Sequence, residues 1–157
     1  MLEMRRKKQM LSAEQNIAIL QRGTSGVLAV QGDAGYPYAV PLNYLYSDAK
    51  IYFHGAKEGY KMDAIRHNSK ASFCVIDADT IVPQEYTSYF RSVIATGKVS
   101  IVTDAAEKRS ALLQLAQKYT PNDPQGCLAV VERQLEHVCV LLFTMEHLTG
   151  KAASELL

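Results

Sequence analysis

Hydrophobic and polar positions along this chain follow two different periods, which together predict a mainly β protein with helices at its margins. A two-residue alternation bounded by turn residues is typical of strands, whereas apolar positions three and four apart are typical of helices. The predicted strands cover residues 26–30, 38–46, 51–54, 71–76, 86–102 and 138–143. The predicted helices cover residues 12–21, 59–67, 105–119 and 128–135. About six antiparallel strands with peripheral helices indicate a small closed or split β-barrel.

One predicted strand, residues 38–46, carries a proline that restricts its place in the sheet. Its apolar face collects Tyr38, Val40, Leu42, Tyr44 and Tyr46. Pro41 and Asn43 point the other way, and Pro41 has no N–H for a neighbouring strand, so this stretch is expected at a sheet edge or bulge. Backbone groups left free there can serve a ligand. If Asn43 is buried it needs hydrogen-bond partners, and a ligand can supply them.

The 157 residues suit a single domain with its own core. Residues 1–10 are expected to form a flexible basic arm, and residues 150–157 a frayed tail. The polar segment 77–84 is expected to be mobile, and residues 120–126 to form a loop. The long strand 86–102 is expected to be broken or bulged near Gly97.

The loop HGAKEGYK, residues 54–61, joins a predicted strand to a predicted helix. Its two glycines allow the backbone to approach a ligand, and a helix N-terminus offers free N–H groups to an anion. Lys57 and Lys61 add positive charge. A helix start usually favours acidic residues, so Lys61 is better explained as a phosphate ligand than as a plain surface lysine. A phosphate site beside Tyr- and Pro-rich strands fits a ligand with a planar ring, such as flavin mononucleotide (FMN).

His54 is the strongest single candidate for chemistry, because it ends a strand beside Gly55. An imidazole there could hydrogen-bond a flavin or a nitro or carbonyl oxygen of a substrate, or act as a general acid. The three cysteines lack CxxC spacing, which argues against a disulfide framework and a zinc site. No metal-binding HExxH, catalytic Gly-x-Ser-x-Gly or P-loop motif occurs, so no protein-built metal site is expected.

Charge and hydropathy limit the classes of partner that this chain is expected to bind. The formal net charge is +1, from 17 basic and 16 acidic residues, so no nucleic-acid partner is expected. The basic run 5–8 is local and is better explained as a solvated arm than as a nucleic-acid or membrane contact. No apolar stretch reaches membrane-spanning length and no signal peptide is apparent. A cytoplasmic protein with a small-molecule substrate is expected.

Four motifs, taken in order, carry a family resemblance: GYPYAVPLNYLY, KIYFHGAKEGYKMDAIRHN, YFRSVIATGKV and the closing HLTGK. Together they resemble the pyridoxamine 5'-phosphate oxidase-like flavoproteins, most closely the nitroimidazole-resistance (Nim) branch. The similarity runs over residues 4–151. It implies an FMN-binding split barrel that forms a homodimer, with the flavin at the subunit interface.

The resemblance also implies where a flavin contacts this chain. The isoalloxazine ring would lie against backbone groups of Val40, Pro41, Leu42 and Asn43. The ribityl chain and ring would lie near His54, Gly55 and Ala56. The phosphate would be held by Lys61, with Lys57 beside it. The long strand would contribute Ser88, Arg91 and Ser92, from the same or the partner subunit.

The implied activity is an FMN-dependent oxidoreductase that reduces a small organic acceptor such as a 5-nitroimidazole, with FAD as an alternative cofactor. Two departures argue against pyridoxamine phosphate as substrate. The chain lacks the Arg-x-His element that the oxidases carry near the C-terminus, and it has Tyr60 where they usually have arginine. A carrier or sensor that binds flavin or haem without turnover is the alternative function, and a dimeric scaffold with an empty site is a third.

Overall fold

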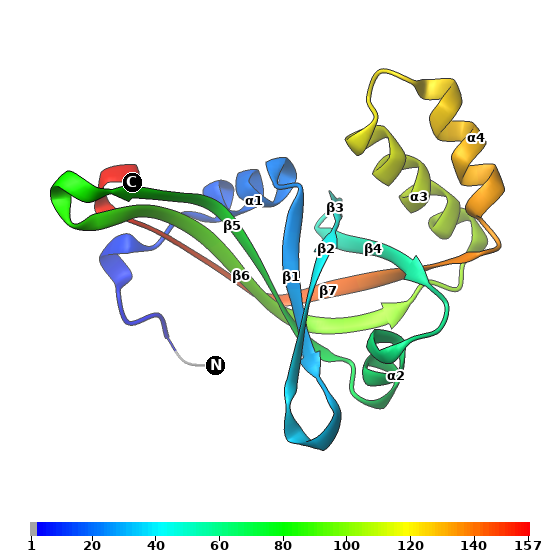
Figure 1. Cartoon of the computed structure of the whole chain (residues 1–157), viewed down its shortest axis with the longest axis horizontal. Helices are drawn as coiled ribbons and strands as arrows, with labels where there is room; N and C mark the ends of the chain where they lie inside the picture. Colours follow the sequence, from blue (N-terminus) through cyan, green and yellow to red (C-terminus); the bar gives the residue numbers. More distant parts are fainter. Residues whose placement is uncertain (1–2) are drawn as a thin grey trace.

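The computed structural model describes residues 3–157, and these form one seven-stranded antiparallel sheet with four α-helices (Figure 1). The strands are β1 (Ser25–Gln31), β2 (Pro37–Asn43), β3 (Leu45–Ser47), β4 (Lys50–Ala56), β5 (Lys70–Val82), β6 (Thr87–Ile101) and β7 (Val138–Ala152). The helices are α1 (Ala13–Arg22), α2 (Tyr60–His67), α3 (Ala105–Tyr119) and α4 (Pro124–Gln134). The predicted mainly β class with peripheral helices is confirmed.

The order of the strands explains why the sheet curls. It is β2-β1-β5-β6-β7-β4-β3, so β2 and β3 lie at opposite edges although only Tyr44 separates them in the chain. The sheet must therefore bend round until its two edges approach at Tyr44, which gives a split barrel. The predicted strand 38–46 is divided at this residue, and seven strands form where about six were expected. Pro41 lies on the edge strand β2, as its missing N–H predicts.

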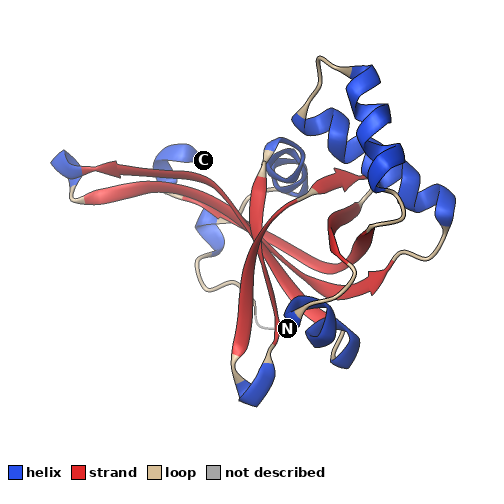
Figure 2. Ribbon diagram, turned by 45° about the vertical axis from the view of Figure 1, so that its right-hand side comes forward, coloured by secondary structure: helices blue, strands red, loops and turns tan. Residues whose placement is uncertain are grey.

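Two apolar clusters hold the sheet and the helices together. The larger one is enclosed by the curled sheet and centres on Phe73, whose ring lies 5.1 Å from the rings of both Tyr44 and Phe53. Helices α1 and α2 contribute buried side chains to it. The second cluster lies on the outer face, where α3 and α4 pack as a hairpin over β3, β4 and β7 (Figure 2).

Polar side chains at the helix starts set where three of the helices begin. Ser12 and Gln15 form a reciprocal capping box on α1. Asp104 caps α3 by accepting from the N–H of Glu107. Asp123 accepts from the N–H of Gly126 at 3.0 Å, and Pro124 follows it at the first helical position. This cap starts α4 within the predicted loop 120–126, four residues before the predicted start.

Strands β5 and β6 extend beyond the barrel as a long two-stranded arm (Figure 1). The expectation of a mobile segment 77–84 is wrong, because residues 78–82 continue the ladder with β6. The register shifts between Ile76 and Ala78, which leaves Asp77 at a bulge. The other expected irregularity is confirmed, since the pairing of β6 with β7 shifts between Thr96 and Gly97.

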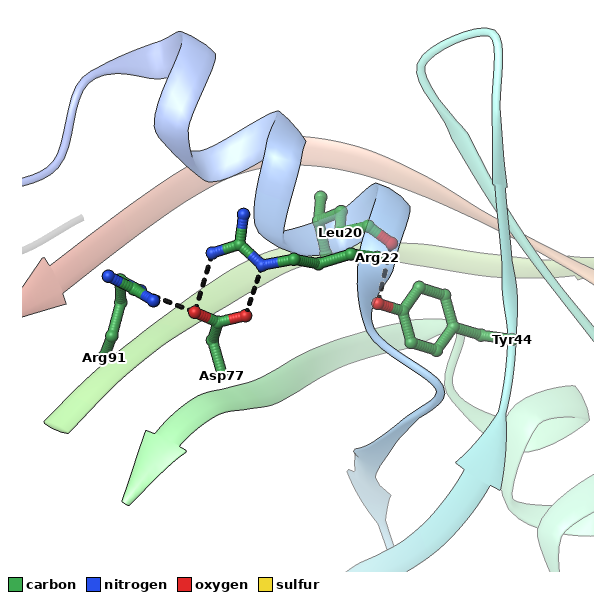
Figure 3. A network of polar contacts seen from close by, with 5 residues as sticks. All are labelled: Leu20, Arg22, Tyr44, Asp77 and Arg91. Atoms are coloured by element: carbon green, nitrogen blue, oxygen red, sulfur yellow. Dashed lines mark hydrogen bonds and ion pairs between the residues drawn. The ribbon is translucent and has the colours of Figure 1, made fainter. Parts of the chain in front are cut away.

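The carboxylate of Asp77 joins the arm to α1 (Figure 3). Its two oxygens accept bonds of 2.7 Å from Nε and a terminal nitrogen of Arg22, and Nε of Arg91 donates to the same carboxylate. The paired hydrogen bonds from Arg22, followed by those from Arg91, lower the pKa of Asp77. The base of the arm is therefore fixed by a buried carboxylate between two arginines.

Both ends of the described chain have regular contacts that the sequence did not indicate. Residues 149–152 pair with β6 as the end of β7, so the expected tail begins as a strand. Within the expected basic arm, Lys7–Gln9 form a 3₁₀ turn and Met10 forms a β-bridge with Lys151. The first two residues of that arm lie outside the described residues. Within residues 3–157, no helix is long and apolar enough to cross a membrane.

We predict that Asp77→Asn lowers the free energy of unfolding at pH 7 by about 1–3 kcal/mol, because two arginines lose their carboxylate partner. The native pKa is depressed, so this stabilisation is complete above the ordinary value of 3.8 and is lost as the pH falls through the lower, folded-state value. Urea unfolding of wild type and variant from pH 7 to pH 3 measures it. Asp79→Asn, an exposed change on the same strand, is the control. An equal loss in both variants would contradict the assignment.

Candidate functional site

The end of β4 and the start of α2 bring His54, Gly55 and Lys61 together. His54 and Gly55 pair with Val140 and Cys139 of β7, so the backbone here is held in the sheet. Gly59 precedes α2 with a φ of 136°, a conformation that L-residues rarely adopt, and it turns the chain into the helix. Lys61 then reaches back over β4, because a Cβ on Gly55 would lie 3.0 Å from its Nζ. The predicted neighbours of the loop do meet in space.

The acidic groups of this loop are paired with an arginine and leave the lysines uncompensated. Arg66 lies 3.5 Å from a carboxylate oxygen of Glu58 and 3.7 Å from one of Asp63. Among the described residues, Lys57 and Lys61 form no ion pair. Burial raises the pKa of the nearby Cys139 thiol, and Lys108, Arg66, Lys57 and Lys61 together oppose that shift. Several cations therefore gather at this end of the sheet.

His54 is poised as a neutral hydrogen-bonding group. Partial burial, followed by repulsion from the Lys61 cation, lowers its pKa below the ordinary 6.5, although part of the ring faces solvent. The imidazole is therefore neutral at pH 7, with one nitrogen that donates and one that accepts. No side chain or backbone group within residues 3–157 hydrogen-bonds it. Both nitrogens are available to a ligand.

The edge strand β2 presents its backbone as expected. Val40 and Leu42 are half-buried against the core, whereas Pro41 and Asn43 face outward. The amide nitrogen of Asn43 donates to the carbonyl oxygen of Thr24 at 2.8 Å, so the chain itself supplies one of the partners that a ligand was expected to provide. The amide oxygen has no partner among the described residues and still faces outward.

The three predicted residues on the long strand lie apart from this group. Ser88, Arg91 and Ser92 belong to the arm or its base, and Arg91 is already paired with Asp77. Figures 1 and 2 both place the arm on the opposite side of the molecule from α2. Within one subunit, the fold therefore does not bring them to His54 and Lys61.

The last turn of α3 is anchored to the same Tyr44 turn that bends the sheet. The ammonium of Lys118 donates to the carbonyl oxygens of Gly23 at 2.6 Å and Tyr44 at 2.8 Å, and lies 4.1 Å from the centre of the Tyr44 ring. Burial lowers the pKa of Lys118 to about 8. The hydroxyl of Tyr119 donates to the carbonyl of Thr24 at 2.6 Å. These contacts fix the helical hairpin over the outer face of β4.

A cavity of about 550 Å³ lies between this hairpin and the sheet, and sequence reasoning missed it. Asn43 and His54 line it from the strands. The helices contribute apolar side chains, which include Leu112, Leu115, Ala116, Cys127, Val130 and Val131. Helical periodicity marked several of these positions as buried, but no signal in the sequence showed that the two helices leave a space above His54.

Residues 12–152 match the sequence profile of the family described as pyridoxamine 5'-phosphate oxidase. This match spans most of the chain, and the chain belongs to the pyridoxamine 5'-phosphate oxidase-like family. Its split-barrel architecture agrees with that assignment. A comparison with curated protein sequences finds no match.

Several solved structures share the fold. The conserved protein Rv2991 from Mycobacterium tuberculosis superposes with a TM-score of 0.85 at 18% identity, over 98% of this chain and 92% of that one. The FAD and heme binding protein from Mycobacterium smegmatis superposes with a TM-score of 0.77 at 19% identity, over 94% of this chain and 74% of that one. A candidate 5-nitroimidazole antibiotic resistance protein from Bacteroides thetaiotaomicron superposes with a TM-score of 0.75 at 24% identity, over 91% of this chain and 86% of that one. At these identities the likeness establishes the fold alone.

We predict that Lys61→Gln raises the pKa of His54 toward its ordinary value, because the neutral amide removes the cation that opposes imidazolium formation. NMR titration of the imidazole resonances measures the shift. Lys57→Gln is the matched control, since Lys57 makes no contribution to the lowered pKa of His54. If the titration midpoint is the same in wild type and Lys61→Gln, the two side chains are not close in solution.

Proposed function

We propose that this protein is an FMN-dependent oxidoreductase that reduces a small organic acceptor such as a 5-nitroimidazole. The observation that carries the proposal is the approach of the Lys61 ammonium to Gly55, directly beside the unpartnered imidazole of His54. Membership of the pyridoxamine 5'-phosphate oxidase-like family supports the same conclusion. The FAD-binding neighbour from M. smegmatis makes FAD the alternative cofactor.

The residues at the end of β4 fit a phosphorylated planar cofactor. Lys61 and Lys57 would hold the phosphate as uncompensated cations beside the start of α2. Because Gly55 has no side chain, a ligand could approach its backbone and that of Ala56, which follows it at the end of β4, next to the Lys61 ammonium. The edge strand offers the backbone of Val40–Asn43 to the ring, while His54 hydrogen-bonds an oxygen of ring or substrate. When bound, the flavin supplies the redox chemistry, and the protein positions it.

The active unit is proposed to be a homodimer. Ser88, Arg91 and Ser92 lie too far round the molecule to join His54 in one subunit, but the extended arm can carry them to the site of a partner. The arm also exposes apolar side chains that a partner would cover, with Ile76 and Ile81 each 67% exposed and Tyr86 97% exposed. These residues support a subunit interface along the arm.

We predict that Lys61→Ala weakens FMN binding about 10–100-fold, because a charge-assisted phosphate contact contributes about 1.5–3 kcal/mol. Titration of flavin-free protein with FMN, followed by fluorescence quenching, measures the dissociation constant. Lys50→Ala, at the exposed start of β4, should bind like wild type. Unchanged affinity in Lys61→Ala would contradict the assignment of Lys61 to the phosphate.

We also predict that the FMN complex is a homodimer. The same samples should sediment as dimers in sedimentation velocity experiments, and a monomeric FMN complex would contradict a site shared between subunits.

We predict that FMN-loaded protein oxidises NADPH or NADH when a nitroimidazole or a quinone is present, and that His54→Ala lowers kcat/KM without lowering the FMN content. The His54 side chain lines the cavity, so its removal should affect the acceptor more than the cofactor. Steady-state absorbance assays and released flavin provide the two readouts. A protein that keeps its flavin but turns over neither acceptor with any reductant would favour the carrier or sensor function, which the heme-binding neighbour also suggests.

A further inference from the structure

The cavity beneath the α3–α4 hairpin has the size of a small-molecule site. Its volume of about 550 Å³ lies within the range of about 300–1,000 Å³ that is typical of ligand pockets. It is bounded by rigid elements on both sides, namely the outer face of the sheet and the two helices. An ion pair between Arg109 of α3 and Glu132 of α4 joins the helices, and Lys118 fixes α3 to the Tyr44 turn. The space is therefore a built feature of the fold.

The charge of the lining limits what the cavity can hold. Among the described residues that line it, Asp123 alone carries a formal charge, and its carboxylate is occupied in capping α4. Within residues 3–157, no lysine or arginine lines the space, and Lys57 and Lys61 both lie outside it. His54 is neutral at pH 7, since burial and Lys61 lower its pKa. An anionic ligand would lose part of its hydration against these walls without gaining a cationic partner.

A few polar groups remain that could orient a neutral ligand. The His54 imidazole and the side-chain amide of Gln134 line the cavity, and neither hydrogen-bonds another described residue. They enter from opposite walls, His54 from β4 and Gln134 from the last turn of α4. Largely apolar walls with a few separated polar groups suit a planar ring that carries carbonyl or nitro oxygens.

We propose that this cavity binds the electron acceptor, and that the acceptor is a neutral, largely apolar ring compound whose specificity is set by the α3–α4 hairpin. This inference rests on the proposed function and extends it, since it assigns separate places to cofactor and acceptor. The phosphate of the cofactor lies with the cations beside Gly55, and the acceptor lies on the helix side of His54. Phosphorylated substrates such as pyridoxamine phosphate are excluded from the cavity by its lack of cations.

Calorimetric titration with a matched pair of probes tests the ligand class. The probes are 2-naphthol, which is neutral at pH 7, and 2-naphthoate, which has the same ring and a carboxylate. We expect 2-naphthol to bind at least about tenfold more tightly, because burial of an unpaired charge is costly. Both titrations are run with and without FMN. The expected preference for 2-naphthol over 2-naphthoate does not require bound flavin. If the protein fails to bind FMN, that result counts against the proposed function, and the comparison of the two probes still tests the cavity.

Two substitutions on the hairpin test the location. Ala116→Phe fills the cavity from α3 and should abolish 2-naphthol binding while leaving FMN affinity within twofold of wild type. Ala129→Phe makes the same change on an exposed position of α4 and should alter neither. Circular dichroism checks folding, and Val130→Phe replaces Ala116→Phe if that variant does not fold. No 2-naphthol binding, equal or tighter binding of 2-naphthoate, or full 2-naphthol affinity in the filled variant would each overturn the proposal.

Discussion

The structure depends on one connection, the single residue Tyr44 that joins two opposite edges of the sheet. Because β2 and β3 are the terminal strands of the order and yet adjacent in sequence, a flat sheet is impossible and the strands must curl. Tyr44 is fully buried at this point, its hydroxyl donates to the carbonyl of Leu20 at 2.7 Å, and its ring packs edge-on against Phe73. A smaller residue would leave a void at the centre of the aromatic core and release α1 from the turn.

The same turn determines where the candidate site forms. Lys118 covers the ring of Tyr44 and donates to its carbonyl, so the end of α3 is held directly above the place where the sheet edges meet. The α3–α4 hairpin lies over the cavity, and β4, next to the edge strand β3, carries His54 and Gly55 close to its end. The aromatic core, the exposed edge strand β2 and the cavity under the hairpin therefore all depend on a single bend in the chain.

Local patterns in the sequence predicted the elements well, and long-range pairing accounts for what they missed. Alternation located most of the strands, and Pro41 placed β2 at an edge. The glycines and lysines of residues 54–61 could be picked out as a candidate site because they lie within one short stretch of sequence. The β5 half of the arm was missed because Asp77, Asp79 and Thr80 interrupt the apolar pattern, and the strand conformation here comes from pairing with β6 rather than from burial. The end of β7 was missed for the same reason. The cavity requires side chains from β2, β4, α3 and α4, and no local signal in the sequence indicates such a combination.

His54 lies at the boundary between a cationic region and a largely apolar one. On one side, Lys61 crosses Gly55 and supplies positive charge suited to a phosphate. On the other side, the cavity contains apolar walls and no cation. A protonated imidazole would bring a cation into the cavity and would repel Lys61. Because Lys61 itself helps to keep the imidazole neutral, the residue that suits the phosphate also preserves the uncharged character of the space beyond it. In the proposed site, Lys61 would therefore act on both sides of His54: it would attract the phosphate, and it disfavours protonation of the imidazole.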